Sequence, residues 1–341
     1  MTNEMNKTWV LRKRPVGDLK EGDLELVESP LAPLADGEVR AKTIYLSLDP
    51  TNRIWMSDMD AYLPPVQIGD PMRGGGLSIV TESRFDGLAP GDIVNTGLAG
   101  WAIYNTLPGA SLAKLPRLPG VPLTAYMGPL GATGMTAYFG LMDIAKPKAG
   151  ETVVVSAAAG AVGSMVGQIA KIQGCRVVGI AGGAEKCRWL TEVAGFDAAI
   201  DYKSEDVGKA LDKHCPNGID INFENVGGKI MDAVMARLND FSRMPLCGLI
   251  STYNDTAPAP GPYNFANLLM RRTLVKGFIV IDYFPRFPEG IQQMAMWLME
   301  GKLKFETDIV DGFEKAPASL SRLFEGKNLG KLVVKVSDEP A

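Results

Sequence analysis

Residues 152–180 read TVVVSAAAGAVGSMVGQIAKIQGCRVVGI, and this stretch decides the fold. The β-branched run Thr152–Ser156 is typical of a strand that is buried on both faces. Residues 164–173 carry apolar side chains at helical spacing, Gly174 ends that helix, and Arg176–Ile180 forms a second apolar strand. The stretch therefore predicts a strand–helix–strand unit with a glycine-rich first turn, where dinucleotide pyrophosphates bind at a helix N-terminus.

The glycine-rich turn departs from the ideal G-x-G-x-x-G pattern, because its three positions fall on Ala158, Gly160 and Gly163. Gly160 lets the backbone approach a pyrophosphate, and Gly163 lets the helix pack closely on the strand. Ala158 can replace the first glycine only if the turn keeps a negative φ there. With its flanking strands the pattern predicts a nucleotide site. The alternative is a tight turn whose small residues serve packing alone.

The end of the second strand bears on which nucleotide is bound. NAD-binding sites usually place Asp or Glu there, to hold the ribose hydroxyls. Here the strand ends in Ala181-Gly182-Gly183, and Glu185 lies further on, in the next predicted helix. Lys186 follows, and an uncharged strand end beside a cation fits a 2′-phosphate, which favours NADPH over NADH. The alternative is that Lys186 is an ordinary solvated helix lysine.

The composition excludes several classes of partner. A length of 341 residues suggests two domains, and 46% apolar and 22% charged residues are usual in a soluble protein. The net charge of −4 argues against nucleic acid or an anionic membrane as the main partner. No apolar run reaches the ~20 residues of a membrane span. The N-terminus, MTNEMNKTWVLRKRP, lacks a signal-peptide core, so we expect a cytoplasmic protein.

The cysteines and the single histidine do not predict a metal site. Cys175, Cys187, Cys215 and Cys247 are widely spaced and form neither a disulfide ladder nor a CxxC zinc pattern. His214, in the polar stretch KHCPNG, is expected to be an exposed loop residue. Because a zinc site needs three or four converging ligands, we expect no catalytic zinc and no metal-dependent alcohol dehydrogenase mechanism.

The sequence pattern changes near residue 130. Before it, short strands punctuated by Pro and Gly predict a small β-barrel, with strands at 7–14, 24–28, 39–47, 77–83, 93–98 and 101–106. After it, strands alternate with helices, which marks a parallel, doubly wound sheet. The strands are expected at 152–156, 176–180, 198–201, 219–223, 244–249 and 274–281. The helices are expected at 131–141, 164–173, 185–194, 207–213, 229–238, 264–271 and 288–300, and a last strand at 332–336 returns to the first domain.

Six segments together resemble the zinc-free medium-chain dehydrogenase/reductases, in the branch of the prostaglandin, 2-alkenal and curcumin reductases. They are SLDP (47–50), YLPPVQIGDPMRGGG (62–76), the long block 137–186, FENVGGK (223–229), CGLISTYN (247–254) and GKNLGK (326–331). The resemblance implies a GroES-like β-barrel domain for substrate and catalysis at residues 1–130, completed by 301–341. It further implies a doubly wound parallel-sheet (Rossmann) domain that binds NADPH at 131–300, and a homodimer.

The resemblance also implies roles for residues that match the family's motifs. The phosphate turn corresponds to Gly160, Ala161, Val162 and Gly163, and the 2′-phosphate contacts correspond to Lys186 and Tyr202. The remaining residues expected along the cofactor and around its nicotinamide are Asn225, Cys247, Gly248, Ser251, Phe278, Ile279, Val280 and Asn328.

The chain departs from the family directly after SLDP. Relatives commonly continue with Tyr-Met-Arg, whereas Thr51-Asn52-Arg53 follows here, so a tyrosine that lines the substrate cleft of related enzymes is missing. Thr51 cannot provide the same aromatic wall, which leaves substrate preference open. Tyr62 matches a second cleft tyrosine of the curcumin reductases. The alternative is an aromatic residue that merely flanks the turn at Pro64 and Pro65.

The function implied by the resemblance is NADPH-dependent reduction of the C=C bond of α,β-unsaturated ketones and aldehydes. This reaction needs hydride at the β-carbon and a hydrogen-bond donor for the charge that builds on the carbonyl oxygen. Tyr253, just beyond a predicted buried strand, is the expected donor and substrate contact. The alternative is that Tyr253 forms a hydrogen bond only with the cofactor ribose or a loop carbonyl. The rival functions are an NADPH:quinone oxidoreductase and a non-catalytic NADPH-binding protein.

Overall fold

The computed structural model describes residues 5–340, which form two compact units. The first unit contains the chain up to Met127 together with residues 308–327 and the segment from Leu332 onward. The second contains residues 128–307 and 328–331. The expected domain boundaries at 130 and 300 therefore move to 127 and 307, and four residues near the C-terminus belong to the second unit rather than the first.

The first unit is organised around β3 (Glu38–Ser47), most of whose residues are buried. It pairs antiparallel with β4 (Gly76–Ser83), β6 (Tyr104–Pro108) and β15 (Lys331–Lys335). The sheet runs in the order β14-β15-β3-β4-β5-β7, with β6 also on β3. Its other strands are β5 (Ile93–Asn95), β7 (Ala113–Lys114) and β14 (Thr307–Asp311). A separate antiparallel pair is formed by β1 (Met5–Leu11) and β2 (Leu24–Pro30).

Two helices of the first unit were not anticipated from the sequence. They are α1 (Thr51–Trp55) and α9 (Ala316–Phe324). Trp55 of α1 and Leu320 of α9 enter one apolar cluster with Trp101, so both helices close the core of this unit. Both are short and begin beside a proline, which gives little periodicity for a sequence pattern to detect.

Six parallel strands form the sheet of the second unit, in the order β10-β9-β8-β11-β12-β13. They are β8 (Thr152–Ser156), β9 (Arg176–Ala181), β10 (Ala198–Asp201), β11 (Ile219–Phe223), β12 (Leu238–Leu246) and β13 (Leu274–Gly277). This order confirms the predicted doubly wound sheet. The order reverses between β8 and β11, and ligands of such sheets bind at the carboxyl ends of the strands at this switch point.

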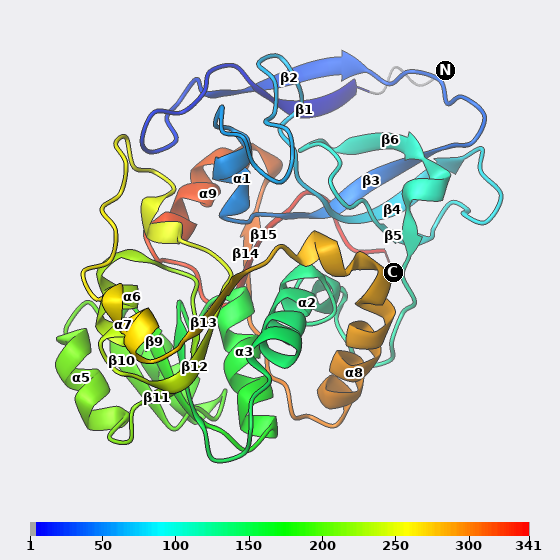
Figure 1. Cartoon of the computed structure of the whole chain (residues 1–341). Coiled ribbons are helices and arrows are strands. Elements are labelled where there is room, and N and C mark those ends of the chain that lie inside the picture. The colour runs from blue at the N-terminus through cyan, green and yellow to red at the C-terminus, as the bar shows by residue number, and fades with distance from the viewer. Residues whose placement is uncertain (1–4, 341) are drawn as a thin grey trace. The chain divides into compact units, whose positions relative to one another are not determined.

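Helices cover both faces of this sheet (Figure 1), with α2 against α3 on one side and α5 against α6 on the other. The α-helices are α2 (Ala132–Phe139), α3 (Ala161–Ile172), α4 (Ala184–Glu192), α5 (Val207–His214), α6 (Gly228–Met235), α7 (Ala266–Met270) and α8 (Phe287–Met299). A π-helical turn at Gly140–Ala145 extends α2, and 3₁₀ turns occupy Gly109–Ser111, Leu123–Tyr126, Ile250–Thr252, Val280–Arg286 and Phe313–Lys315. Within residues 5–340, no helix is long and apolar enough to cross a bilayer.

Two predicted strands of the second unit have the wrong bounds. β12 begins at Leu238, inside the helix expected at 229–238, and ends before the expected limit at 249. Its sequence contains Asp240 and Pro245, which disfavour strands, so pairing with β11 and β13 overrides the local preference. β13 stops at Gly277 instead of continuing to 281, because a 3₁₀ turn begins at Val280.

In the turn after β8, the residue with a strained backbone conformation is Ala157. This residue has a φ of 48°, in the left-handed region that favours glycine. Ala158, the residue in the first glycine position, keeps a negative φ, so the condition for replacing that glycine is met. A side chain in the left-handed region costs about 1–2 kcal/mol. The turn therefore stores strain one residue before the glycine pattern begins.

We expect Ala157→Gly to stabilise the protein, because glycine adopts a positive φ without the clash of a Cβ atom. The gain should be at most about 1 kcal/mol, since glycine also loses more backbone entropy on folding. A higher midpoint of thermal unfolding would be the result. Ala158→Gly is the control: this alanine is fully buried and has a negative φ, so its loss should lower the midpoint. A lower midpoint for Ala157→Gly would contradict the assignment of strain.

Candidate functional site

The glycine turn joins β8 to the N-terminus of α3 at the switch point. Gly160 is the N-cap of this 12-residue helix and provides no side chain to cap it. The first N–H groups of a helix lack acceptors within the helix and favour an anion, such as a pyrophosphate. A Cβ atom on Gly163 would lie 2.4 Å from the carbonyl oxygen of Ala157, so α3 approaches β8 closely only because residue 163 is glycine.

A segment from near the C-terminus lies on the same turn. The N–H of Gly330 donates to the carbonyl oxygen of Ala159 at 2.8 Å, and Gly330 forms a parallel bridge with Gly160. Asn328 is 9% exposed, and its Nδ2 donates to the carbonyl oxygen of Gly330 at 3.0 Å. The structure therefore brings Asn328 close to the turn between β8 and α3.

The turn between β9 and α4 carries the residues expected at the 2′-phosphate. Lys186 is half-buried in the first turn of α4. Tyr202 follows β10, and its ring covers Gly182: a Cβ atom on Gly182 would lie 2.8 Å from the ring. Burial and the charge of Asp201 raise the pKa of Tyr202, so its phenol is protonated at neutral pH and can donate a hydrogen bond.

Asp201 is a residue of this region that the sequence analysis missed. Its Oδ1 accepts from the N–H of Gly183 at 2.7 Å and from the N–H of Lys203 at 3.0 Å, and its Oδ2 accepts from the Ser204 hydroxyl at 2.9 Å. The bond from Gly183 is the main cause of a lowered pKa, so this carboxylate is ionised at neutral pH. It fixes the Gly182–Gly183 turn. The sequence does contain a signal for this residue, namely an Asp at the end of a predicted strand. That strand is β10, the neighbour of β9, and not β9 itself.

The carboxyl ends of β11 and β12 hold the next group of expected residues. Asn225 donates from its backbone N–H to the Ser156 hydroxyl at 2.8 Å and from Nδ2 to the Ser156 carbonyl at 2.7 Å. Cys247 and Gly248 both donate backbone N–H groups to the carbonyl oxygen of Glu224, at 2.9 and 3.2 Å. Burial and the nearby Glu224 raise the pKa of the Cys247 thiol to about 12, so this cysteine is a neutral group and not a thiolate.

Ser251 and Tyr253 lie at the short 3₁₀ turn that follows β12. The Ser251 hydroxyl donates to the carbonyl oxygen of Val226 at 2.6 Å, which joins this turn to the loop after β11. The phenol oxygen of Tyr253 accepts from the N–H of Leu249 at 3.1 Å. This contact orients the phenol of Tyr253 at the carboxyl edge of the sheet.

Phe278 lies differently from Ile279 and Val280, although the three were expected together at the nicotinamide. The ring of Phe278 is 9% exposed and meets the ring of Phe223 edge to face at 6.2 Å. It therefore packs in the interior of the second unit. Ile279 and Val280 are half-buried.

In the first unit, Thr51 and Tyr62 contact each other. Their hydroxyl groups form a hydrogen bond, and Tyr62 is 41% exposed. Thr51 thus lies at the start of α1 and holds the phenol of the second expected cleft residue. The contact between the two side chains is therefore polar.

The cysteines and the histidine do not form a cluster. In the part of the chain that the structure describes, no three His, Cys, Asp or Glu side chains lie close enough to hold a metal ion. The prediction for His214 was wrong, because it is the half-buried last residue of α5 rather than an exposed loop residue. Burial and the charge of Lys213 lower the pKa of His214, so it is neutral at neutral pH.

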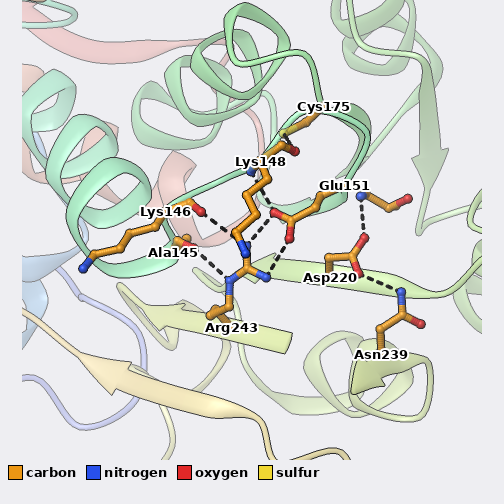
Figure 2. Close-up of polar contacts among 9 residues, drawn as sticks. Ala145, Lys146, Lys148, Glu151, Cys175, Asp220, Asn239 and Arg243 are labelled. Carbon is orange, nitrogen blue, oxygen red and sulfur yellow. Dashed lines mark hydrogen bonds and ion pairs between the residues drawn. The ribbon is translucent and has the colours of Figure 1, made fainter. Parts of the chain in front are cut away.

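A cavity of about 620 Å³ lies at the opposite, amino end of the second-unit sheet. Its wall contains the ion pair of Arg243 and Glu151 (Figure 2), in which Nη1 and Oε1 are 2.9 Å apart. The Nε of Arg243 also donates to the carbonyl oxygen of Ala145 at 2.8 Å. Burial is the largest single influence and acts to raise the pKa of Glu151, but the hydrogen bonds and charges of Arg243 and Lys148 together outweigh it, so the net shift is downward. This closed network has no part in the site at the carboxyl edge.

The residues at the carboxyl edge fit a phosphorylated dinucleotide. The start of α3 provides N–H groups beside an uncapped glycine, and Lys186 and Tyr202 flank the next strand end with a cation and a phenol. Asn225, Cys247 and Gly248 follow the strands on the other side of the switch point. Together with the strand order, this turn defines the dinucleotide-binding class of α/β domain.

Comparison with known proteins gives the family. The domain family described as "N-terminal domain of oxidoreductase" matches residues 7–115, and the one described as "Zinc-binding dehydrogenase" matches residues 161–296. The chain is 46% identical over 341 residues to the NADPH-dependent curcumin reductase of Escherichia coli (strain K12), covering 98% of each chain. It is 41% identical over 340 residues to the NADP(+)-dependent 2-alkenal reductase of Nicotiana tabacum, also covering 98% of each.

A solved structure agrees with these relatives. The crystal structure of CurA from Vibrio vulnificus in complex with NADPH has a TM-score of 0.92 and 44% identity, and the match covers 98% of this chain and 100% of that one. This chain therefore belongs to the medium-chain dehydrogenase/reductase family, in the branch of the curcumin, 2-alkenal and prostaglandin reductases.

Proposed function

We propose that this protein is an NADPH-dependent reductase of the C=C bond of α,β-unsaturated ketones and aldehydes. The observation that carries the proposal is the near-full-length identity of 46% and 41% to reductases named for curcumin and 2-alkenals. The chain itself contains the glycine turn, Lys186, Tyr202 and the CGLISTYN segment, which are the parts that the proposed chemistry requires.

The proposed cofactor site follows the carboxyl edge of the second-unit sheet. The N–H groups of Ala161, Val162 and Gly163 bind the pyrophosphate, and Lys186 and Tyr202 bind the 2′-phosphate. Further contacts come from Gly160, Asn225, Cys247, Gly248, Ser251, Phe278, Ile279, Val280 and Asn328. When bound, NADPH supplies the hydride that reaches the β-carbon of the substrate.

The protein's contribution to the chemistry is a hydrogen bond to the substrate oxygen. Negative charge builds on the carbonyl oxygen as the β-carbon gains hydride, and a donor placed there stabilises it. We assign this role to Tyr253, whose phenol oxygen is held by the N–H of Leu249. The α-carbon then takes a proton, so no metal or paired acid and base is required of the chain.

The first unit is proposed to contact the substrate through Tyr62. Its phenol is bonded to Thr51, where relatives have a tyrosine, so this part of the site is more polar and less bulky than an aromatic pair. We therefore expect a substrate preference different from that of relatives with both tyrosines.

A panel of enones, enals and quinones, followed by NADPH oxidation, tests the function directly. We expect turnover of enones and enals to exceed turnover of quinones, because the relatives at 46% and 41% identity are named for curcumin and 2-alkenals. When NADPH is deuterated at the transferred position, the reduced product should carry the deuterium on its β-carbon. Preferred turnover of quinones would favour a quinone oxidoreductase, and binding without oxidation would favour a non-catalytic protein.

Lys186→Ala tests the choice of cofactor. Removal of the ammonium group should raise KM for NADPH by about tenfold or more, since a hydrogen bond to a charged group is lost. KM for NADH should change little, because NADH has no 2′-phosphate. Lys209→Ala, at an exposed lysine of α5, is the control and should alter neither value. Equal effects of Lys186→Ala on both cofactors would remove Lys186 from the 2′-phosphate site.

Tyr253→Phe tests the donor. Loss of one such donor typically lowers kcat on the order of 100-fold, and affinity for NADP⁺ should be nearly unchanged. Tyr126→Phe is the control, because this phenol donates to the carbonyl oxygen of Pro116 at 2.6 Å in the first unit and serves structure alone. Unchanged turnover for Tyr253→Phe would leave Tyr253 without a part in the reaction.

A homodimer is proposed from the exposed edge of the second-unit sheet. β13 pairs with β12 on one side, and its exposed residues include Leu274 (51%) and Val275 (39%). Nearby apolar side chains are also exposed, among them Phe241 at 67% on β12. An exposed apolar edge strand is a template for pairing, and two copies can pair about a two-fold axis.

Val275→Lys tests the dimer, because a charge on the edge opposes strand pairing. We expect the wild type to sediment as a dimer and the variant as a monomer. Ile309→Lys is the control: it lies on β14, at the edge of the other sheet, and is 46% exposed. Dimers of Val275→Lys at the same concentration would contradict this interface.

The cytoplasm is the proposed location. Cys175, Cys187, Cys215 and Cys247 are all free, as is usual where thiols are kept reduced. NADPH-dependent reduction of small carbonyl compounds is compatible with that compartment.

A further inference from the structure

A buried acid, Glu224, lies at the switch point of the second-unit sheet and has no role in the chemistry above. It directly follows β11, and its side chain is fully buried. Fully buried glutamates are rare unless their oxygens are hydrogen-bonded. The location at the carboxyl end of β11, beside β8, is where a dinucleotide crosses a sheet of this order.

The Oε1 atom of Glu224 gathers three donors from two segments. It accepts from the Ser156 hydroxyl at 2.9 Å, from the N–H of Val226 at 2.7 Å and from the N–H of Gly227 at 2.8 Å. Ser156 is the last residue of β8, and Val226 and Gly227 form the loop that leads to α6. One oxygen therefore ties the end of β8 to the loop after β11.

The backbone of Glu224 connects a third segment, the end of β12, to the ends of β8 and β11. Its N–H donates to the carbonyl oxygen of Pro245 at 3.0 Å, and its carbonyl oxygen accepts from Cys247 and Gly248. The ends of β8, β11 and β12 thus meet at one residue. Asn225, which follows Glu224, donates two hydrogen bonds to Ser156, so the position of Ser156 determines the position of Asn225.

The second oxygen has a different partner. Oε2 accepts from Nδ2 of Asn222 at 2.9 Å, and Oδ1 of Asn222 is buried with no hydrogen-bond partner in the described part of the chain. A rotation of the Asn222 amide by half a turn would present Oδ1 to this position. A neutral amide at residue 224 could then donate to Oδ1 while its own oxygen kept the three donors of Oε1.

We propose that Glu224 is a positioning residue for the dinucleotide: the acceptor Oε1 holds Asn225 and the Val226–Gly227 backbone in place beside the end of β8. The proposal rests on the proposed NADPH site. Residue 224 functions through its acceptor oxygen Oε1 and not through its negative charge. Glu224 itself touches no reacting atom and acts through the loop that it holds.

Two variants separate the acceptor from the charge. Glu224→Met keeps most of the volume but removes the acceptor, so the Ser156 hydroxyl and two loop N–H groups lose their partner. Glu224→Gln removes the charge and keeps Oε1, with Asn222 able to turn toward the new amide. The matched control is Asp220→Ala on the same strand, where the carboxylate accepts from Thr152 N–H at 2.8 Å and Asn239 Nδ2 at 2.8 Å at the other end of β11.

The dissociation constant of NADP⁺, measured by calorimetry, is the main readout. We expect Glu224→Met to raise it by at least about tenfold. Glu224→Gln and Asp220→Ala should stay within about threefold of the wild type. Amide hydrogen exchange at residues 225–228 without cofactor should accelerate in Glu224→Met alone, and the thermal midpoint reports whether each variant is folded.

Two results would overturn the proposal. One is a folded Glu224→Met variant with wild-type affinity for NADP⁺ and wild-type exchange at 225–228. The other is a Glu224→Gln variant as weak in binding as Glu224→Met, because charge would then be what matters. A wild-type protein that does not bind NADP⁺ would refute the proposed function separately, and the hydrogen-exchange comparison would still decide whether Glu224 holds the loop.

Discussion

The close approach of α3 to the end of β8 is the constraint on which the rest of the second unit depends. The helix starts directly at the turn because Gly163 has no Cβ to meet the carbonyl oxygen of Ala157. This approach brings the first N–H groups of α3 to the switch point, where an anion can use them. The cost is local, since Ala157 occupies the left-handed region. The turn thus brings α3 close to β8 at the expense of a strained backbone conformation at Ala157.

Around this turn, hydrogen bonds from distant parts of the chain fix the remaining strand ends. Asp201 holds the Gly182–Gly183 turn, and Glu224 holds the ends of β8, β11 and β12 together. Both carboxyl groups face backbone N–H donors. Glycine-rich turns have few side chains that could fix their own conformation. A site built from such turns therefore needs acceptors from other segments to bind its backbone N–H groups.

The sequence predicted the central strands β8 and β11 of the second-unit sheet well because they are largely buried on both faces. β8, β10 and β11 have the expected bounds, and β8 is the continuous β-branched run that a strand buried on both faces should be. β12 was misplaced because Asp240 and Pro245 oppose a strand, and only pairing with two neighbours overrides them. Asp201 and Glu224 could not be found, since each acts on a segment that becomes adjacent only when strands pair. The contact of Thr51 with Tyr62 likewise joins the start of α1 to a loop that no local pattern connects with it.

The bridge between Gly160 and Gly330 has a consequence for how the protein is made. Gly330 follows Gly160 by 170 residues in the chain, yet its N–H donates a hydrogen bond to the turn that follows the first strand of the second-unit sheet. A ribosome releases the N-terminal part of a chain first, so this turn is made long before the segment that contacts it. The contact forms only after residue 330 has left the ribosome, and a nascent chain shorter than that has an incomplete turn.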